Sequence, residues 1–496
     1  MKKIDNPDSP FKAGMYLLDS FTSGMYNDPL IVYREYIQNA VDSIDVAQGN
    51  GALPLEVRIQ LDPATRSITI CDNALGVSAA QAEEVLSAIG SSNKSESGLR
   101  GFRGIGRLGG IAFSDRAIFR TKAKGESVES IQEWDCRTLR KLLAEQKKES
   151  LTLEEVFWRV TSFRQEPSYK TQYSYFEVSL IGVSSFRNQL FDLERVRRYL
   201  RQVAPVPFSV EEFSYALEID QYLSARITNY GRYDIFLNGE PIRKPYRDSV
   251  RITKGDADAV DGIEFFSIDR GKDRPLAYGW YGRRRELLGS IARGDDSSGV
   301  RVRVGNIQIG DAHLLDSCYR EPRFNSYVTG EIHVTCPHLI PNSRRDDFVD
   351  NHEKGQFYTL IEKVIGLPIS KEIRSRSRLA SVQLAPKSAM QMPKPSATPM
   401  GAMDKNADDS PAAKCRNCTD QEVEGTGNDG KALSLQSASE QAESSLLGPS
   451  TLNDQTLRAV LTRLCHGCPK LAKLVALLQQ KDATFGQLGT PPADAQ

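Results

Sequence analysis

Histidine is scarce in this chain of 496 residues, which contains only five histidines and none before His313. Chemistry in the preceding part of the chain must use carboxylates, amides, cations and backbone groups, which excludes a phosphoaccepting or triad histidine there. No apolar run approaches the roughly 20 residues that span a bilayer, and the N-terminus lacks the apolar core of a signal peptide. Eight cysteines form no disulfide framework, so we expect a cytoplasmic protein with reduced thiols.

An excess of one charge is also lacking, because 64 Lys and Arg balance 64 Asp and Glu. The overall charge therefore gives no sign of a protein that binds nucleic acid or a membrane. The length leaves room for two or three domains with sizeable cores.

Sequence patterns divide the chain into four parts. Residues 1–185 interleave amphipathic helices with hairpin strands, which predicts an α/β sandwich in an α+β protein. Residues 190–370 predict a second α/β domain, whose strands include residues 233–237. Residues 380–450 have the composition of a disordered linker, and residues 451–483 have the pattern of a C-terminal amphipathic helix.

The most informative segment is Tyr-Arg-Glu-Tyr-Ile-Gln-Asn-Ala-Val-Asp, which begins at Tyr33 and has the apolar spacing of a helix. Glu35, Asn39 and Asp42 fall at i, i+4 and i+7, so they form a polar stripe on this helix. A carboxylate one turn before a carboxamide suits general-base chemistry beside Mg²⁺, because amide and phosphate oxygens suit this ion. The alternative is a solvated helix face.

Two further segments contain glycine. Asp72 ends a predicted strand, where it can accept a hydrogen bond from an exocyclic amine, and Gly76 would let a flat base approach the backbone. Gly101, Gly104 and Gly106 begin a glycine-rich run that can wrap phosphates with backbone N–H groups. This run is neither a P-loop nor a Rossmann segment. A hairpin turn and an ordinary loop are the alternatives.

In order and spacing, the three segments resemble the Bergerat-fold ATPases, the GHKL superfamily of gyrase, Hsp90, histidine kinases and MutL. The resemblance implies that ATP and Mg²⁺ are bound, that Glu35 is the general base orienting the attacking water, and that Asn39 is the Mg²⁺ ligand. It also implies that Asp42 is part of the pocket wall and that Asp72, with Gly76, binds the adenine. Gly101, Gly104 and Gly106 would border the triphosphate.

The resemblance extends to residues between and after these motifs. Residues 89–95 are similar to the mobile lid of the family, in which Lys94 would meet the phosphates. Thr171 is similar to the threonine that reaches the water network between adenine and Asp, and Thr121 competes for that role. One departure is Ala74, which replaces the first glycine of the Asp-x-Gly-x-Gly motif and would tighten the base pocket.

The second domain resembles the middle domain of Hsp90, which implies a transducer domain. Residues 330–346 are similar to a stretch that ends in a loop, from which an arginine reaches the γ-phosphate and couples the domains. Arg344 aligns best with that catalytic arginine, and Arg345 is second. A planar guanidinium suits the charge that develops during phosphoryl transfer. An ordinary surface pair of arginines is the alternative.

The function implied is an ATPase (an ATP phosphohydrolase) that works as a transient homodimeric clamp on a protein client, without a membrane. Two alternatives stay open: a DNA-associated clamp like those of MutL and MORC, and a nucleotide sensor that does not hydrolyse ATP. Nucleic acid would meet the basic clusters at Arg243-Lys244, Arg283–Arg285 and Arg374–Arg378, for which ordinary solvated charge is the alternative. A zinc site is a further possibility, because Cys415, Cys418, Cys465 and Cys468 supply the four thiolates that such a site needs.

Overall fold

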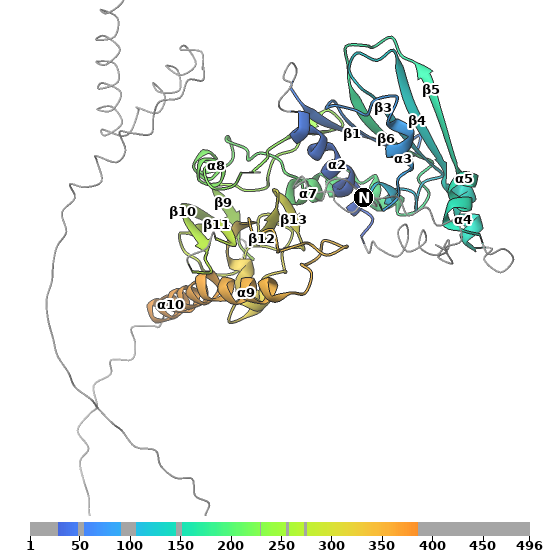
Figure 1. The fold of residues 1–496 in the computed structure, drawn as a ribbon. Coiled ribbons are helices and arrows are strands. Elements are labelled where there is room, and N and C mark those ends of the chain that lie inside the picture. Colours follow the sequence, from blue (N-terminus) through green and yellow to red (C-terminus); the bar gives the residue numbers. More distant parts are fainter. Residues whose placement is uncertain are drawn as a thin grey trace, which may run out of the picture. The chain divides into compact units, whose positions relative to one another are not determined.

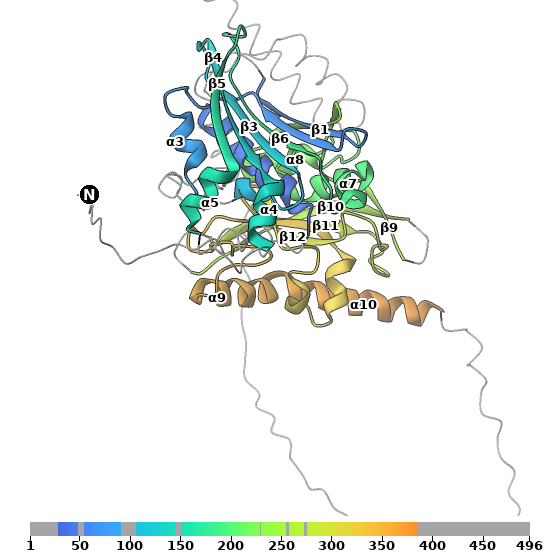
Figure 2. The same cartoon turned by 90° about the vertical axis from the view of Figure 1, so that its right-hand side faces the viewer.

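The structure is a computed structural model that describes residues 28–47, 54–90, 106–144, 151–228, 230–253, 257–271 and 275–384 (Figures 1 and 2). Several predictions lie outside the described residues: those for Lys94, Gly101 and Gly104, the four cysteines of the zinc hypothesis, the linker beyond residue 384 and the C-terminal helix. Within these ranges, no helix is long and apolar enough to cross a membrane.

The first domain is built on an eight-stranded sheet with the order β5-β4-β3-β6-β2-β1-β7-β8. Every neighbouring pair is antiparallel except β1 and β7, which run parallel. The strands are β1 Glu56–Asp62, β2 Ser67–Asp72, β3 Arg116–Lys122, β4 Val128–Asp135, β5 Thr161–Pro167, β6 Tyr175–Ile181, β7 Asp234–Leu237 and β8 Glu240–Pro241.

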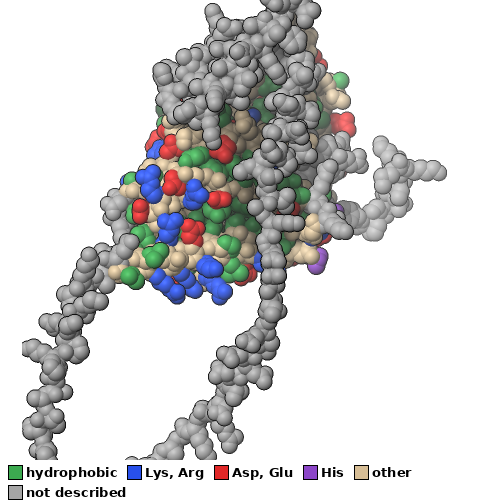
Figure 3. Space-filling view, turned by 90° about the vertical axis from the view of Figure 1, so that its left-hand side faces the viewer, with side chains coloured by type: hydrophobic (Ala, Val, Ile, Leu, Met, Phe, Trp, Pro, Cys, Tyr) green, Lys and Arg blue, Asp and Glu red, His purple; other side chains and the backbone are tan. Residues whose placement is uncertain are grey.

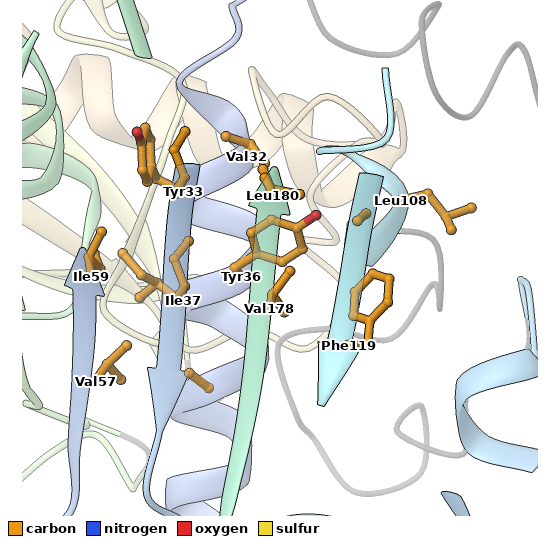
Figure 4. Packing of buried hydrophobic residues seen from close by; sticks show 14 of the residues in the cluster. Val32, Tyr33, Tyr36, Ile37, Val57, Ile59, Leu108, Phe119, Val178 and Leu180 are labelled. Atoms are coloured by element: carbon orange, nitrogen blue, oxygen red, sulfur yellow. The ribbon is translucent and has the colours of Figure 1, made fainter. Parts of the chain in front are cut away.

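Helices pack against this sheet, and the most central of them is α2. Tyr33, Tyr36 and Ile37 of α2 point into the core, where strands β1, β2, β3 and β6 contribute buried aliphatic and aromatic side chains (Figure 4). Burial alternates along β1 and β2 because only one face of the sheet meets the helices. The helices of this part are α2 Ile31–Ala47, α3 Ala82–Ser87, α4 Cys136–Ala144, α5 Leu153–Val160, α6 Arg187–Leu190 and α7 Leu193–Val203, with a 3₁₀ turn η3 at Gly106–Leu108.

The first sheet extends past residue 185, where the sequence pattern placed the end of the first domain. Strand β7 pairs with β1 along Glu56–Ile59, and residues of α7 such as Val196 and Leu200 are buried in the same core. The strand predicted at residues 233–237 therefore belongs to the first sheet. We accordingly assign β7 and β8 to the first domain, whereas residues of α8, which precedes β7, pack with the second domain.

The second domain contains a six-stranded sheet with the order β13-β12-β14-β11-β10-β9, in which only β12 and β14 run parallel. Helices α9 and α10 are joined by a π-helical turn at Glu362–Gly366 and follow one another beneath this sheet (Figure 2). The elements are α8 Ala216–Ser224, β9 Ser249–Arg251, β10 Ala257–Ile268, β11 Ala277–Arg284, β12 Gly299–Val304, β13 Ile307–Ile309, β14 Thr329–Val334, α9 His352–Ile361 and α10 Leu367–Leu384, with 3₁₀ turns at Asp316–Cys318 and Pro322–Tyr327. The mixed α+β class is thus confirmed.

A buried charge cluster around Glu331 ties the two domains together. The Glu331 carboxylate accepts hydrogen bonds from Lys244 Nζ at 2.6 Å and from Tyr246 OH at 3.0 Å, and it also pairs with Arg303 Nε. Arg303 donates in turn to the carbonyl of Gln202 at the end of α7. Burial lowers the pKa of Lys244 to about 7, whereas Arg303 and Lys244 outweigh burial and hold the pKa of Glu331 well below its usual range.

Candidate functional site

Glu35 lies on α2 between two guanidinium groups. Its Oε1 atom is 3.3 Å from Arg345 Nε and 3.7 Å from Arg34 Nη2, and only 11% of its side chain is exposed. Arg345 comes from the second domain, more than three hundred residues further along the chain. The carboxylate predicted as a general base is therefore the point at which the second domain meets the predicted catalytic helix.

The end of the glycine-rich run is packed against Glu35. A Cβ atom on Gly106 would lie 2.4 Å from Glu35 Oε2, so a larger residue would displace the carboxylate. Gly110 N donates a hydrogen bond of 3.1 Å to the hydroxyl of Tyr36, which follows Glu35 in α2. The structure therefore brings together two of the three predicted segments, and the lack of a side chain at Gly106 leaves room for the Glu35 carboxylate.

Asn39 and Asp42 continue along α2 beyond Glu35 but differ in exposure. Asn39 is partly buried one turn after Glu35, whereas Asp42 is fully buried. Asn39 therefore keeps some exposure to solvent, and its role as the Mg²⁺ ligand stays a prediction. The role of Asp42 in the pocket wall stays a prediction.

Asp72 ends β2 and is 3% exposed, and its carboxylate accepts a hydrogen bond of 3.1 Å from the backbone N–H of Ala74. In the sheet, Asp72 pairs with Phe176 of β6, and Phe176 pairs with Thr121 of β3. Thr121 and Asp72 therefore lie at the same level of the sheet, on the two strands that flank β6. Thr171 lies outside these strands, in the turn before β6, where its carbonyl accepts from Gly125 N at 2.8 Å.

The hydroxyl of Thr121 is already engaged within the protein. It donates to the carbonyl of Tyr175 at 3.0 Å and accepts from the N–H of Val77 at 2.8 Å. Because a hydroxyl has one proton and two lone pairs, Thr121 can only accept a further hydrogen bond. Thr121 and Asp72 therefore both offer acceptors, which suits a donor such as an exocyclic amine.

Gly76 holds its loop against the ends of β3 and β6. Its φ is +64°, and a Cβ atom there would lie 2.0 Å from the carbonyl oxygen of Lys122 and 2.9 Å from that of Tyr175. Any other residue would push the loop off the sheet. Ala74, the departure from the family motif, is buried, and its carbonyl accepts from Ser174 Oγ.

The arginine hairpin, defined here as residues 341–348, presents two arginines to α2. Pro341 and Phe348 pair at its base, and the N–H of Asn342 donates to the carbonyl of Asp347 at 2.9 Å. Arg344 meets α2 through its backbone, because its carbonyl accepts from Arg34 Nη2 at 3.1 Å while its own side chain is exposed. The structure therefore brings Arg345 to Glu35, although Arg344 is the better match in the alignment.

These residues fit a nucleotide with Mg²⁺. A buried carboxylate and a threonine offer acceptors to a base, Gly76 keeps the nearby backbone close-packed, and Gly106 leaves room for the Glu35 carboxylate. Asn39 supplies an oxygen of the type that Mg²⁺ prefers.

Comparison with known proteins identifies the class of this site. Residues 29–166 match the family described as "Histidine kinase-, DNA gyrase B-, and HSP90-like ATPase". This range contains α2, the Asp72–Gly76 loop and the glycine-rich run. This part of the chain is therefore similar to the GHKL ATPases, and the predicted resemblance to that superfamily is confirmed.

Individual relatives are bacterial proteins named chaperone protein HtpG. The protein of Albidiferax ferrireducens is 30% identical over 139 residues, which are 24% of this chain and 21% of the relative. The protein of Methylibium petroleiphilum is 36% identical over 111 residues, which are 21% of this chain and 17% of the relative. The chain thus spans about a fifth of the length of the curated relatives it matches.

Two contributors to the site escaped the sequence reasoning. Arg34 stands beside Glu35 in the motif, but only the fold shows that it binds the hairpin backbone. Ser174 fixes the loop at Ala74 from a distance of 100 residues in sequence, and no local pattern marks it.

Replacing Asp72 with asparagine tests the base pocket. We expect Asp72→Asn to weaken binding of adenine nucleotides by roughly 1.5–3 kcal/mol, because an amide accepts the amine proton less strongly than a carboxylate does. Calorimetric titration measures this loss. Asp62→Asn is the control, since Asp62 closes the turn at the other end of the same hairpin. Equal affinities of wild type and Asp72→Asn would remove Asp72 from the pocket.

Proposed function

We propose that this protein is a Mg²⁺-dependent ATPase that works as an ATP-gated dimeric clamp on a protein client. The observation that carries the proposal is the 3.3 Å contact between Glu35 Oε1 and Arg345 Nε. This contact puts a carboxylate from the ATPase domain and a guanidinium from the second domain at one point. ATP hydrolysis needs both groups, a base for water and a cation for the developing phosphoryl charge.

The chemistry proposed for each residue follows from its place. Glu35 orients water and accepts its proton, and Arg345 turns from Glu35 toward the γ-phosphate when ATP is bound. Asp72 and Thr121 accept hydrogen bonds from the base. Asn39 would hold Mg²⁺, which when bound neutralises phosphate charge.

The clamp is proposed because the ATP site is coupled to the second domain. If ATP draws Arg345 toward the phosphate, the arginine hairpin and the strand β14 before it follow. The position of the second domain then depends on which nucleotide is bound. The relatives named chaperone protein HtpG support a protein client.

The basic clusters give little support to the DNA-clamp alternative. Arg283 lies 3.2 Å from Glu264, and Arg374 lies 3.2 Å from Glu321, so carboxylates already neutralise part of this charge. In the space-filling view, Lys and Arg side chains are interspersed with Asp and Glu on the upper left part of the coloured surface, and several Lys and Arg side chains gather at its lower edge (Figure 3). Such a mixed surface is ordinary solvated charge rather than a phosphate-binding stripe.

The experiment for this proposal measures ATP affinity and turnover with Mg²⁺ and with EDTA. Wild type should hydrolyse ATP only with Mg²⁺ and should bind it more tightly when Mg²⁺ is present. We expect Asn39→Ala to lose the Mg²⁺-dependent part of the affinity, because the amide oxygen completes the coordination of the ion. Ser43→Ala, one turn further along α2, is the control. A wild-type chain without ATP turnover would overturn the proposal, and an Asn39→Ala chain with the full Mg²⁺ effect would remove Asn39 as the ligand.

A further inference from the structure

Arg345 has a backbone conformation that needs support. Its φ is +56°, in the left-handed region that residues other than glycine adopt only when their surroundings hold them there. Within the hairpin, its N–H donates to the carbonyl of Asn342 at 3.2 Å, and its own carbonyl accepts from Gly310 N at 2.8 Å. These bonds fix the tip of the hairpin but do not fix its base.

The base of the hairpin is held by Asp347. One oxygen of its carboxylate accepts from Tyr358 OH at 2.6 Å, and the other pairs with Lys354 Nζ at 2.8 Å. Both partners belong to α9. The backbone carbonyl of the same residue closes the hairpin by accepting from Asn342 N, so Asp347 joins the hairpin to a helix of the second domain.

Neighbours of Asp347 make further contacts with α9. Phe348, the next residue, is buried against Phe357 of α9 with ring centroids 5.6 Å apart. Asn351 caps α9 by accepting from Lys354 N, and its amide donates to the carbonyl of His338 just before the hairpin. Lys354 and Tyr358 outweigh burial and lower the pKa of Asp347, so this carboxylate stays charged at neutral pH.

We propose that Asp347 is a positioning residue for ATP hydrolysis, which fixes the arginine hairpin to α9 and thereby places the Arg345 guanidinium beside Glu35, from where it turns to the γ-phosphate. The proposal rests on the proposed ATPase function. Asp347 does not touch the predicted nucleotide site itself. It acts through Arg345, and a misplacement of about 1 Å at a reacting group can cost 10²-fold in rate.

The test compares ATP turnover and nucleotide affinity of full-length variants. Asp347→Ala should lower kcat by roughly 10- to 100-fold, with nucleotide Kd and melting temperature close to those of wild type. Asp350→Ala is the matched control, because Asp350 pairs with the same Lys354 at 2.6 Å but is 94% exposed and lies outside the hairpin. It should keep the wild-type kcat.

A double variant separates positioning from general stability. In an Arg345→Ala chain, Asp347→Ala should cause no further loss of kcat, because its only route to the reaction has been removed. A further loss, or a wild-type kcat in Asp347→Ala alone, would overturn the positioning role. Tyr358→Phe replaces Asp347→Ala if the latter does not fold, and it should lower kcat several-fold by the same route; an unchanged kcat there counts against the proposal.

The outcomes distinguish this inference from the function on which it rests. If wild type does not hydrolyse ATP, the proposed function fails. If wild type and Asp347→Ala hydrolyse ATP equally fast while Arg345→Ala is slow, the ATPase stands and only the role of Asp347 is lost.

Discussion

Glu35→Ala should abolish measurable ATP hydrolysis, a loss of roughly 10²–10⁴-fold, and should leave ATP affinity within a few-fold of wild type. A general base acts on water rather than on the nucleotide, so binding and turnover should separate. A coupled phosphate-release assay and calorimetry on the same preparation measure the two effects. The nucleotide-bound variant should also accumulate as a dimer in sedimentation experiments, because a clamp that cannot hydrolyse ATP has no route to reopen.

Glu35→Gln is the control for packing. It keeps the shape that fills the space beside Gly106, where the carboxylate leaves no room for a Cβ atom. Glu35→Gln should be as inactive as Glu35→Ala. If both variants lose nucleotide binding together with turnover, Glu35 is structural. If both bind ATP normally and wild type turns over no faster, the protein is a nucleotide sensor.

Arg345→Ala should reduce turnover by up to about 10³-fold, at the lower end of the range for an arginine that stabilises phosphoryl-transfer charge. Arg344→Ala should have a smaller effect. The Arg344 side chain is exposed, and its contact with α2 uses a carbonyl that alanine also has. Single-turnover measurements with saturating ATP show which of the two variants loses more of the hydrolysis rate.

Nucleotide affinity provides the control for both arginines, since neither belongs to the first domain. It should change by no more than a few-fold in either variant. Arg345→Lys keeps the charge but not the planar fork, so it should recover only part of the rate. A larger loss of turnover in Arg344→Ala than in Arg345→Ala would mean that the hairpin changes its conformation when ATP binds, so that Arg344 replaces Arg345.

The local parts of the site could be predicted because the chemistry and the helix period lie in the same short segment. Tyr33 and Ile37 recur at helical spacing and are buried by α2, whereas Glu35 and Asn39 of the same helix are only partly buried. Asp72 at a strand end with Gly76 after it is equally local. The φ of +64° at that glycine explains why no other residue type serves there.

The remaining assignments depend on contacts between distant segments. Thr121 stands in line with Asp72 only because β6 lies between β2 and β3, and sheet order is not a local property. Adjacent residues of an irregular segment can point in opposite directions. The choice between Arg344 and Arg345 therefore depends on the left-handed turn at Arg345, which Gly310 supports from another loop.

The parallel pairing of β1 with β7 also affects synthesis on the ribosome. Val57 pairs with Ile235, so the first sheet cannot be completed until β7, about 180 residues further along the chain, has been synthesised. At 5–20 residues per second, the stretch between residues 185 and 241 takes roughly 3–11 s to make. During this time β1 is an uncovered edge that carries Val57, Ile59 and Leu61, and such edges pair with other chains. We therefore expect the nascent chain to be most prone to aggregation before its second sheet has been translated.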